Sequence, residues 1–186
     1  FHRGRAIEMR IETQRFGTIT LDQEQLFLFP AGLIGMESLR DWALLPDLEN
    51  PAVAWLQSAS RGDRALPMIS PRAFFEDYRV QVSRRELAGL HMKPGAEMYV
   101  LSAISGHAGK VTANLRSPIL LNLSRRLGCQ VITDNLQPLQ QGITSLKCDS
   151  INSTGRDALS QLSDSTSASI TAATSASLVN RMRSAA

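Results

Sequence analysis

The sequence predicts an all-β fold, a small antiparallel β-barrel with one short helix and a disordered C-terminal tail. Apolar and polar residues alternate with a period of two through much of residues 9–143, which is typical of strands with one buried face. Gly, Pro, Asn and Asp separate these short runs, as turns do in compact sandwiches and barrels. From Thr144 onward the composition shifts to Ser, Thr and Ala. The 186 residues therefore suit one domain with an appendage.

This composition divides the chain into three parts. Residues 1–8 are an N-terminal extension, because the strand pattern begins only after them, and residues 9–143 are the barrel domain. Residues 144–186 are a tail that we expect to be mostly disordered, since few large apolar residues remain to offset the entropy of ordering it. One stretch of the tail, SLVNRMRSA, could place apolar side chains on one face of a helix too weak to fold alone. These side chains are Leu178 and Met182 of the stretch, together with Ile170 before it.

Strands are expected wherever the alternation is bounded by turn residues. The first two lie at residues 9–16 and 16–21, and a short apolar run that stops at a proline follows at 26–30. The remaining candidates share these features and lie at residues 53–58, 65–70, 78–83, 98–105 and 130–133.

Two stretches are candidates for helix. In SRRELAGLHM, Ser83 is an N-cap and Glu86 follows three residues later, which is the pattern of a capping box, so a short helix is expected there. In MESLRDWALL, residues 36–45, the apolar residues have mixed spacing, and we expect at most one helical turn.

The stretch FPAGLIGME, residues 29–37, has two glycines three positions apart after a predicted strand. A phosphate-binding loop needs a longer glycine pattern and a following helix, and both are missing from the sequence here. We therefore expect a tight turn in which Gly32 and Gly35 take positive φ or allow a close approach of the backbone.

The stretch SPRAFFEDY, residues 70–78, joins two phenylalanines to two carboxylates. Adjacent residues of a strand point to opposite faces, so Glu76 and Asp77 are poorly placed to act together as a general acid and base. The phenylalanines are expected to cover one end of the core, with Asp77 or Tyr78 binding buried backbone groups.

Several functional classes find no support in the sequence. Cys129, Cys148 and the three histidines have neither the spacing of metal ligands nor that of a catalytic set, so we expect no metal, no cofactor and no enzyme activity. Residues 9–143 carry 14 Lys or Arg and 13 Asp or Glu, a balance that does not favour direct nucleic-acid binding. No apolar run approaches the roughly 20 residues of a membrane helix, and no secretory signal is visible, so a cytoplasmic protein is expected.

The stretch TANLRSPILLNL, residues 112–123, interrupts an apolar run with polar residues and a proline. Thr112 and Asn114 would share one face of a strand, and Pro118 suits a sheet edge or bulge. Turn chemistry inside the barrel explains these residues, and so does an exposed sheet edge that receives a partner strand or helix. The candidate partner-binding residues are Thr112, Asn114, Leu115, Arg116, Pro118 and Asn122.

In their order along the chain, these motifs resemble the bacterial flagellar assembly factor FliW family. The resemblance runs from about Met9 to Ile143 and includes RFGTITL, FPAGLIGME, WLQS at 55–58, SPRAFFEDY and, most specifically, TANLRSPILLNLSRRLGCQVI. It implies a small, mostly antiparallel β-barrel. Met36 departs from the family pattern, which usually has an aromatic residue there, and residues 91–98 lack the acidic run common in relatives.

The resemblance implies regulation without catalysis. Family members bind flagellin and also the RNA-binding translational repressor CsrA, so that scarcity of free flagellin releases the factor to hold CsrA and allows flagellin mRNA to be translated. A second hypothesis is a small-barrel module that binds mRNA directly, as oligonucleotide-binding barrels do with aromatic platforms. A steep salt dependence of RNA affinity would favour this alternative.

Overall fold

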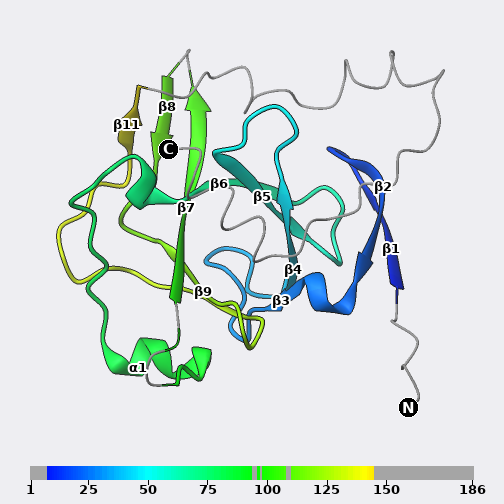
Figure 1. Ribbon diagram of the computed structural model, residues 1–186, viewed down its shortest axis with the longest axis horizontal. Helices are drawn as coiled ribbons and strands as arrows, with labels where there is room; N and C mark the ends of the chain where they lie inside the picture. The colour runs from blue at the N-terminus through cyan, green and yellow to red at the C-terminus, as the bar shows by residue number, and fades with distance from the viewer. Residues whose placement is uncertain (1–7, 94–95, 97, 108–109, 145–186) are drawn as a thin grey trace.

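The computed structural model describes residues 8–93, 96, 98–107 and 110–144 (Figure 1). The predicted tail at 144–186 lies outside these residues except for Thr144, and the predicted extension at 1–8 does so except for Glu8. The described part confirms the predicted small, mostly antiparallel barrel with one short α-helix. The first strand begins one residue earlier than expected, at Glu8.

Seven of the described strands form a closed ring in the order β7-β6-β5-β4-β3-β10-β9, and the pairing of β9 with β7 closes it. All neighbours in the ring are antiparallel except β10 and β3, which are parallel. The ring strands are β3 (Leu26–Leu28), β4 (Asp41–Pro46), β5 (Val53–Ser58), β6 (Ala65–Ile69), β7 (Met98–His107), β9 (Ile119–Asn122) and β10 (Leu127–Gln130).

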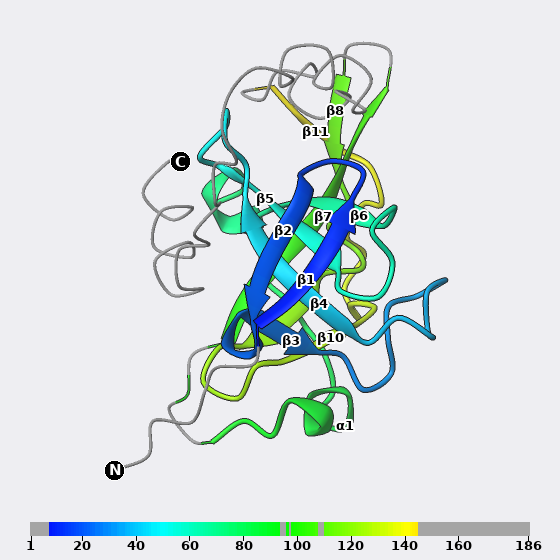
Figure 2. The same cartoon turned by 90° about the vertical axis from the view of Figure 1, so that its right-hand side faces the viewer.

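Two additions flank the ring. Strands β1 (Glu8–Thr13) and β2 (Gly17–Asp22) form a separate hairpin that lies across β4 and β5 (Figure 2). On another side, the long strand β7 continues beyond the ring and pairs with β8 (Lys110–Ala113), which in turn pairs with β11 (Gln141–Ile143). The strands β7, β8 and β11 thus form an arm that projects from the barrel (Figure 1).

Burial on two sides explains why β5 has no simple alternation. Leu44 of β4 and Leu56 of β5 pack inside the barrel, whereas Trp55 packs beneath the hairpin with Ile19 and Leu21. Every residue of β5 is consequently buried. Apolar burial of this kind contributes about 25 cal/mol per Å² of apolar surface, so the hairpin and the barrel stabilise each other.

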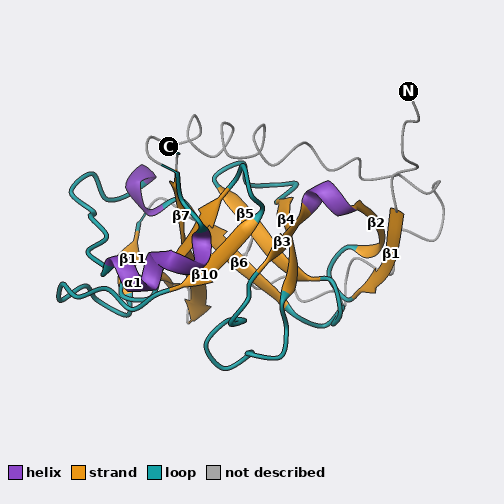
Figure 3. Ribbon diagram, turned by 90° about the horizontal axis from the view of Figure 1, so that it is seen from below, coloured by secondary structure: helices purple, strands orange, loops and turns teal. Residues whose placement is uncertain are grey.

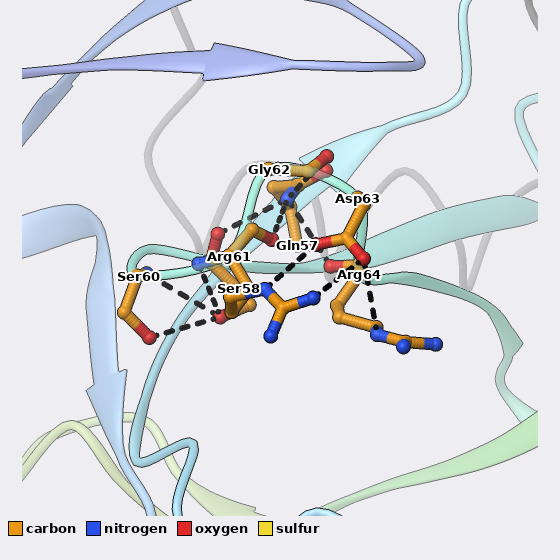
Figure 4. A network of polar contacts seen from close by, with 7 residues as sticks. All are labelled: Gln57, Ser58, Ser60, Arg61, Gly62, Asp63 and Arg64. Atoms are coloured by element: carbon orange, nitrogen blue, oxygen red, sulfur yellow. Dashed lines mark hydrogen bonds and ion pairs between the residues drawn. The ribbon is translucent and has the colours of Figure 1, made fainter.

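The polar end of the WLQS motif organises the loop that follows it (Figure 4). Gln57 is fully buried, and its Nε2 donates to the carbonyl oxygens of Ser58, Arg61 and Arg64 at 3.0, 3.2 and 3.1 Å. Ser58 Oγ accepts the backbone N–H of Arg61 at 3.2 Å. Backbone carbonyls that are removed from water need a hydrogen-bond donor inside the protein. The buried amide of Gln57 provides that donor and thereby fixes the conformation of the loop.

The capping box predicted at Ser83 is confirmed. Helix α1 (Arg84–Leu87) begins after Ser83, whose backbone N–H donates to Glu86 Oε2 at 2.9 Å while Ser83 Oγ accepts from Glu86 N at 3.4 Å. The hydrogen bonds from Ser83 hold the pKa of Glu86 below its ordinary value. A 3₁₀ turn (Ala88–Leu90) continues the helix, at the opposite end of the molecule from the β1–β2 hairpin (Figure 3).

Three sequence-based assignments are corrected. Residues 36–45, expected to form at most a helical turn, contain strand β4, whose apolar residues are buried on both faces and therefore lack the period of two. Residues 78–83 alternate as a strand would but do not form one. A single backbone-to-backbone hydrogen bond, from Asp134 N to Gln81 O, joins them to residues 134–135. The predicted strand at 130–133 is instead β10, which lies earlier in the chain.

The glycine turn between β3 and β4 has the predicted conformation. Gly32 and Gly35 have φ of 70° and 81°, in the left-handed region. Between them, the backbone N–H of Ile34 donates to Gln130 Oε1 at 2.9 Å, and the N–H of Gly35 donates to Glu37 Oε1 at 2.8 Å. The turn is therefore fastened to β10 and closed on itself.

Candidate protein-binding surface

The structure divides the predicted partner-binding residues into interior and surface groups. Leu115 is 4% exposed, Asn122 is 2% exposed, and Pro118 is buried as well. Pro118 and Asn122 therefore lie in the interior, and Leu115 keeps only the small accessible surface that lines the groove described below. Thr112 and Asn114 are partly exposed and the Arg116 side chain is exposed. A role in partner binding stays a prediction for all six residues, and exposure favours it most for these three.

The two asparagines of the 112–123 stretch have structural partners. Asn122 Nδ2 donates to Leu90 O at 2.9 Å, and its Oδ1 accepts Arg125 N at 3.2 Å, so this residue joins β9 to the 3₁₀ turn and to the β9–β10 turn. Asn114 Oδ1 accepts the backbone N–H groups of Arg116 and Ser117 at 3.1 and 3.0 Å. Side chains of this type satisfy backbone donors where the chain leaves a strand.

Strand β8 is not an exposed sheet edge, which was one of the two explanations considered for this stretch. Strand β11 pairs with it on the side away from β7, so β11 is the outer strand of the arm among the described residues. Thr112 lies opposite Ser105 of β7 and Gly142 of β11, and its hydroxyl is 3.2 Å from Ser105 Oγ. The hydroxyls of Ser105 and Thr112 lie on the more exposed face of the arm, whereas Val111 and Ala113 point to the buried side.

These contacts give different expectations for two alanine substitutions. Asn114→Ala removes an acceptor from two backbone donors and is expected to lower the free energy of unfolding by about 1 kcal/mol. Thr112→Ala removes one exposed hydrogen bond between the hydroxyls of Thr112 and Ser105. It is expected to change the free energy of unfolding by less than about 0.5 kcal/mol. Urea denaturation of both variants checks this. Equal losses of stability would show that Thr112 also supports the turn.

Beside the 114–118 connection, the structure forms a shallow groove of about 370 Å³. It is lined by Phe75, Glu76, Asp77, Tyr78, Leu115, Gln137, Pro138 and Gln141. Tyr78 and Leu115 are almost fully buried, and Tyr78 Oη donates to Leu115 O at 2.8 Å. Burial raises the pKa of Tyr78 to about 12, so the phenol keeps its proton at neutral pH and remains a donor. The predicted role of Tyr78 in binding a buried backbone group is thereby confirmed.

The rim of the groove exposes large apolar side chains. Leu136 is 95% exposed and Leu139 is 57% exposed, on either side of the lining residues Gln137 and Pro138. The backbone here is held in place, because Leu115 N donates to Pro138 O at 3.1 Å. Apolar side chains that a fixed backbone holds in water are candidates for contact with another protein.

A second set of contacts positions this rim from the side of residues 79–81. Asn135 Nδ2 donates to Arg79 O at 3.1 Å, and Thr133 N donates to Arg116 O at 3.0 Å. Sequence reasoning found Tyr78 and Leu115 but missed residues 136–141. The available signal was the pair of leucines around Pro138, since a proline within a short apolar stretch argues against a buried central strand.

The groove has an acidic side. Glu76 and Asp77 are exposed, and neither carboxylate belongs to a salt bridge in the described part of the chain. The nearby Arg79 guanidinium donates to the carbonyl oxygens of Glu76 and Tyr78, at 2.8 and 2.9 Å, rather than to a carboxylate. An apolar segment that carries positive charge would therefore complement the groove.

Other chemistry has little basis in the described residues. They contain no cluster of three or more His, Cys, Asp or Glu side chains placed to hold a metal ion. Burial, with a smaller contribution from Glu86, raises the pKa of Cys129 to about 11, so its thiol is not an activated nucleophile. None of the described helices is both long and apolar enough to cross a membrane.

The closed ring of seven strands, with its flanking hairpin and arm, places the protein in the class of small β-barrel domains. Residues 10–141 match the family model of the FliW protein, and the chain belongs to this family of flagellar assembly factors, as the sequence motifs predicted.

Individual relatives agree with this assignment. The flagellar assembly factor FliW of Moorella thermoacetica is 35% identical over 129 residues, which cover 68% of this chain and 82% of the relative. That of Natranaerobius thermophilus is 32% identical over 127 residues, or 67% and 84% of the two chains. A crystal structure of the flagellar assembly factor FliW superposes with a TM-score of 0.67 at 25% identity, covering 72% of this chain and 95% of the other.

Proposed function

We propose that this protein is a non-catalytic, cytoplasmic regulator of flagellum assembly that binds flagellin as a chaperone-like partner and antagonises the repressor CsrA. In this scheme, abundant flagellin occupies the protein. When free flagellin falls, the protein is released to hold CsrA, and translation of flagellin mRNA resumes. Membership of the FliW family supports the role in assembly, and the partners follow from the resemblance of the motifs to that family.

The groove beside residues 114–118 is the surface that we assign to flagellin. The observation that carries this assignment is the exposure of Leu136 and Leu139 on a backbone held by hydrogen bonds. Contacts of this kind gain affinity by removing apolar surface from water, and the fixed backbone limits the entropy lost on binding. Arg116, Asn114 and Thr112 lie along the chain that leads into the groove and are proposed to border the same contact.

The assignment predicts a selective loss of affinity. Replacing Leu136 and Leu139 together by serine is expected to weaken flagellin binding by about ten-fold or more, because truncated apolar anchors at the centre of an interface typically cost over 1 kcal/mol. The melting temperature is expected to stay nearly the same, since both side chains are already in water. Calorimetric titration with purified flagellin measures the effect.

Leu48→Ser is the matched control. Leu48 is also largely exposed, at 76%, but lies between β4 and β5 and does not line the groove. It should bind flagellin as the unchanged protein does. If Leu48→Ser and the double variant weaken binding equally, or if neither does, the groove is not the flagellin site.

Binding experiments with the purified protein distinguish this proposal from the alternative of direct RNA binding. A purified sample mixed with CsrA is expected to co-elute from a sizing column, and its own affinity for flagellin mRNA is expected to be weak. RNA binding whose affinity falls steeply with salt, without co-elution with CsrA, would favour the alternative.

A further inference from the structure

We propose that a segment of this chain's own C-terminal tail, around Leu178 and Met182, occupies the groove and competes with flagellin for it. This regulation rests on the proposed function, because the groove is the site assigned to flagellin. The contact between tail and groove is nevertheless a separate physical claim, and it is measured without flagellin.

The first argument is the exposed apolar surface. Leu136 at 95% and Leu139 at 57% exposure flank a groove whose floor is Tyr78 and Leu115. Large apolar side chains exposed to water beside a concavity gain free energy when another apolar segment covers them. The occupant should bring apolar side chains and positive charge, because Glu76 and Asp77 line one side without a salt bridge among the described residues.

The second argument is the path of the chain. Gln141, the first residue of β11, lines the groove, and β11 ends at Ile143, so the last described residues lie within a few positions of this site. From Thr144 to Leu178 there are 35 residues, and a chain of that length can span up to about 110 Å. The distance back to the groove is therefore no obstacle. A covalent link also raises the effective concentration of a segment, up to the millimolar range.

The third argument is the chemistry of the segment. Residues 165–186 contain Arg181 and Arg183 but no Asp or Glu, whereas the three acidic residues of the tail all come earlier. In a helix, Leu178 and Met182 are four residues apart and share a face. The segment thus combines a short apolar face with positive charge, which complements an apolar groove with an acidic side.

A contact this small suits a competitor that flagellin must displace. Two apolar side chains cannot hold the groove as tightly as a larger partner does, so the tail lowers the apparent affinity for flagellin without abolishing binding. When only a fraction of the molecules has a free groove, the apparent dissociation constant rises by the inverse of that fraction. We expect an increase of about three-fold to ten-fold on this basis.

Hydrogen exchange on the full chain tests the contact directly. Leu178→Ser combined with Met182→Ser is expected to speed amide exchange at residues 75–78 and 135–141 by about three-fold or more relative to the unchanged protein, because an uncovered segment opens more often. Ala176→Ser is the matched control, since it makes the same kind of change, from an apolar residue to serine, in the same segment at a position that a helix turns away from Leu178 and Met182. It should exchange like the unchanged protein.

Charge reversal provides an independent test. Arg181→Glu with Arg183→Glu is expected to speed exchange at the groove, and adding Glu76→Lys with Asp77→Lys in the same chain is expected to slow it again. Restoration by the second change would distinguish a direct contact from loss of folding. Melting temperatures of all variants should be alike.

Three results would overturn the proposal. One is identical exchange at the groove in the unchanged protein and in the Leu178→Ser, Met182→Ser variant. A second is equal acceleration by Ala176→Ser. The third is protection that disappears on dilution, since the segment would then come from a second copy of the chain. Flagellin titration separates the two claims: faster exchange in the variant with unchanged flagellin affinity would retain the tail contact and move the flagellin site elsewhere.

Discussion

Alanine at Gly32 is expected to lower the free energy of unfolding by about 2–4 kcal/mol, whereas alanine at Gly35 is expected to lower it by about 1 kcal/mol. Both glycines have positive φ, at 70° and 81°. Both substitutions therefore carry the cost of placing a side chain in the left-handed region. The difference between them comes from the space around each residue.

A Cβ at Gly32 would lie 2.5 Å from the Cα and the carbonyl oxygen of Glu37. These are backbone atoms of the same tight turn, and the bridge between Leu33 and Met36 keeps them in place. No atom outside the immediate chain neighbours lies within 4 Å of a Cβ built at Gly35. Alanine at Gly32 must therefore distort the turn, while alanine at Gly35 meets only the backbone strain.

Urea denaturation of the two variants measures this difference. The fluorescence of the buried Trp42 and Trp55 reports the fraction of native protein. A Gly32→Ala variant as stable as Gly35→Ala would mean that the turn opens without cost. That result would remove the structural explanation for the first glycine of the motif.

The turn also shows how far the sequence reaches. The glycines and the proline before them predicted positive φ, because this conformation depends on local chemistry. A close approach of the backbone at these glycines was also expected, but its partner at Gly32, the backbone of Glu37, was not predictable, since it depends on how the turn folds back. The bond from Ile34 N to Gln130 Oε1 joins residues far apart in sequence and left no local signal at all.

Whether a strand could be predicted from its sequence depended on what covers its two faces. Strand β2 faces the barrel on one side and water on the other, so its alternation was readable. Strand β4 has the barrel core on one face and the hairpin on the other, and its run of buried residues at 42–45 resembled a mixed helical pattern. Residues 78–83 alternate without pairing as a strand, because the segment packs its apolar residues Val80 and Val82 against the core from outside the sheet.

The candidate site was half predictable. The 112–123 stretch was recognised as unusual, and Leu115 does line the groove. Asn122 is buried and has internal partners, Leu90 O and Arg125 N, and sequence alone does not distinguish such an asparagine from an exposed one. The opposite side of the groove comes from residues 137–141, which approach through the pairing of β11 with β8 and the hydrogen bond from Leu115 N to Pro138 O.

A buried carboxylate that the sequence did not reveal joins the β1–β2 hairpin to the barrel. Asp47, at the end of β4, is 4% exposed. Its Oδ2 accepts Trp55 Nε1 at 2.7 Å and lies 3.4 Å from Arg15 Nη2, while its Oδ1 accepts the N–H groups of Glu49 and Asn50 at 3.0 and 2.8 Å. The carboxylate thus fixes both the turn after β4 and the tryptophan beneath the hairpin.

The hairpin contributes its own half of this contact. The guanidinium carbon of Arg15 lies 3.6 Å from the centre of the Trp55 ring, and Phe16 meets the same ring edge to face at 6.2 Å. Cation–π and aromatic pairs of this kind are each worth about 0.5–2 kcal/mol. The RFG and WLQS motifs, separate in sequence, are therefore two sides of one packing contact.

Asp47→Ala is expected to lower the free energy of unfolding by about 3 kcal/mol, because the buried Trp55 N–H loses its acceptor, the turn loses two hydrogen bonds, and Arg15 loses its counter-charge. Asp63→Ala is the matched control. Asp63 pairs with Arg61 at 2.9 Å, but both side chains are partly in water, and such pairs contribute about 0–1 kcal/mol. Urea denaturation followed by tryptophan fluorescence compares the two variants. Similar small losses for both would show that the hairpin is held by apolar packing alone, through Ile19 and Leu21, and that the Asp47 contacts add little to it.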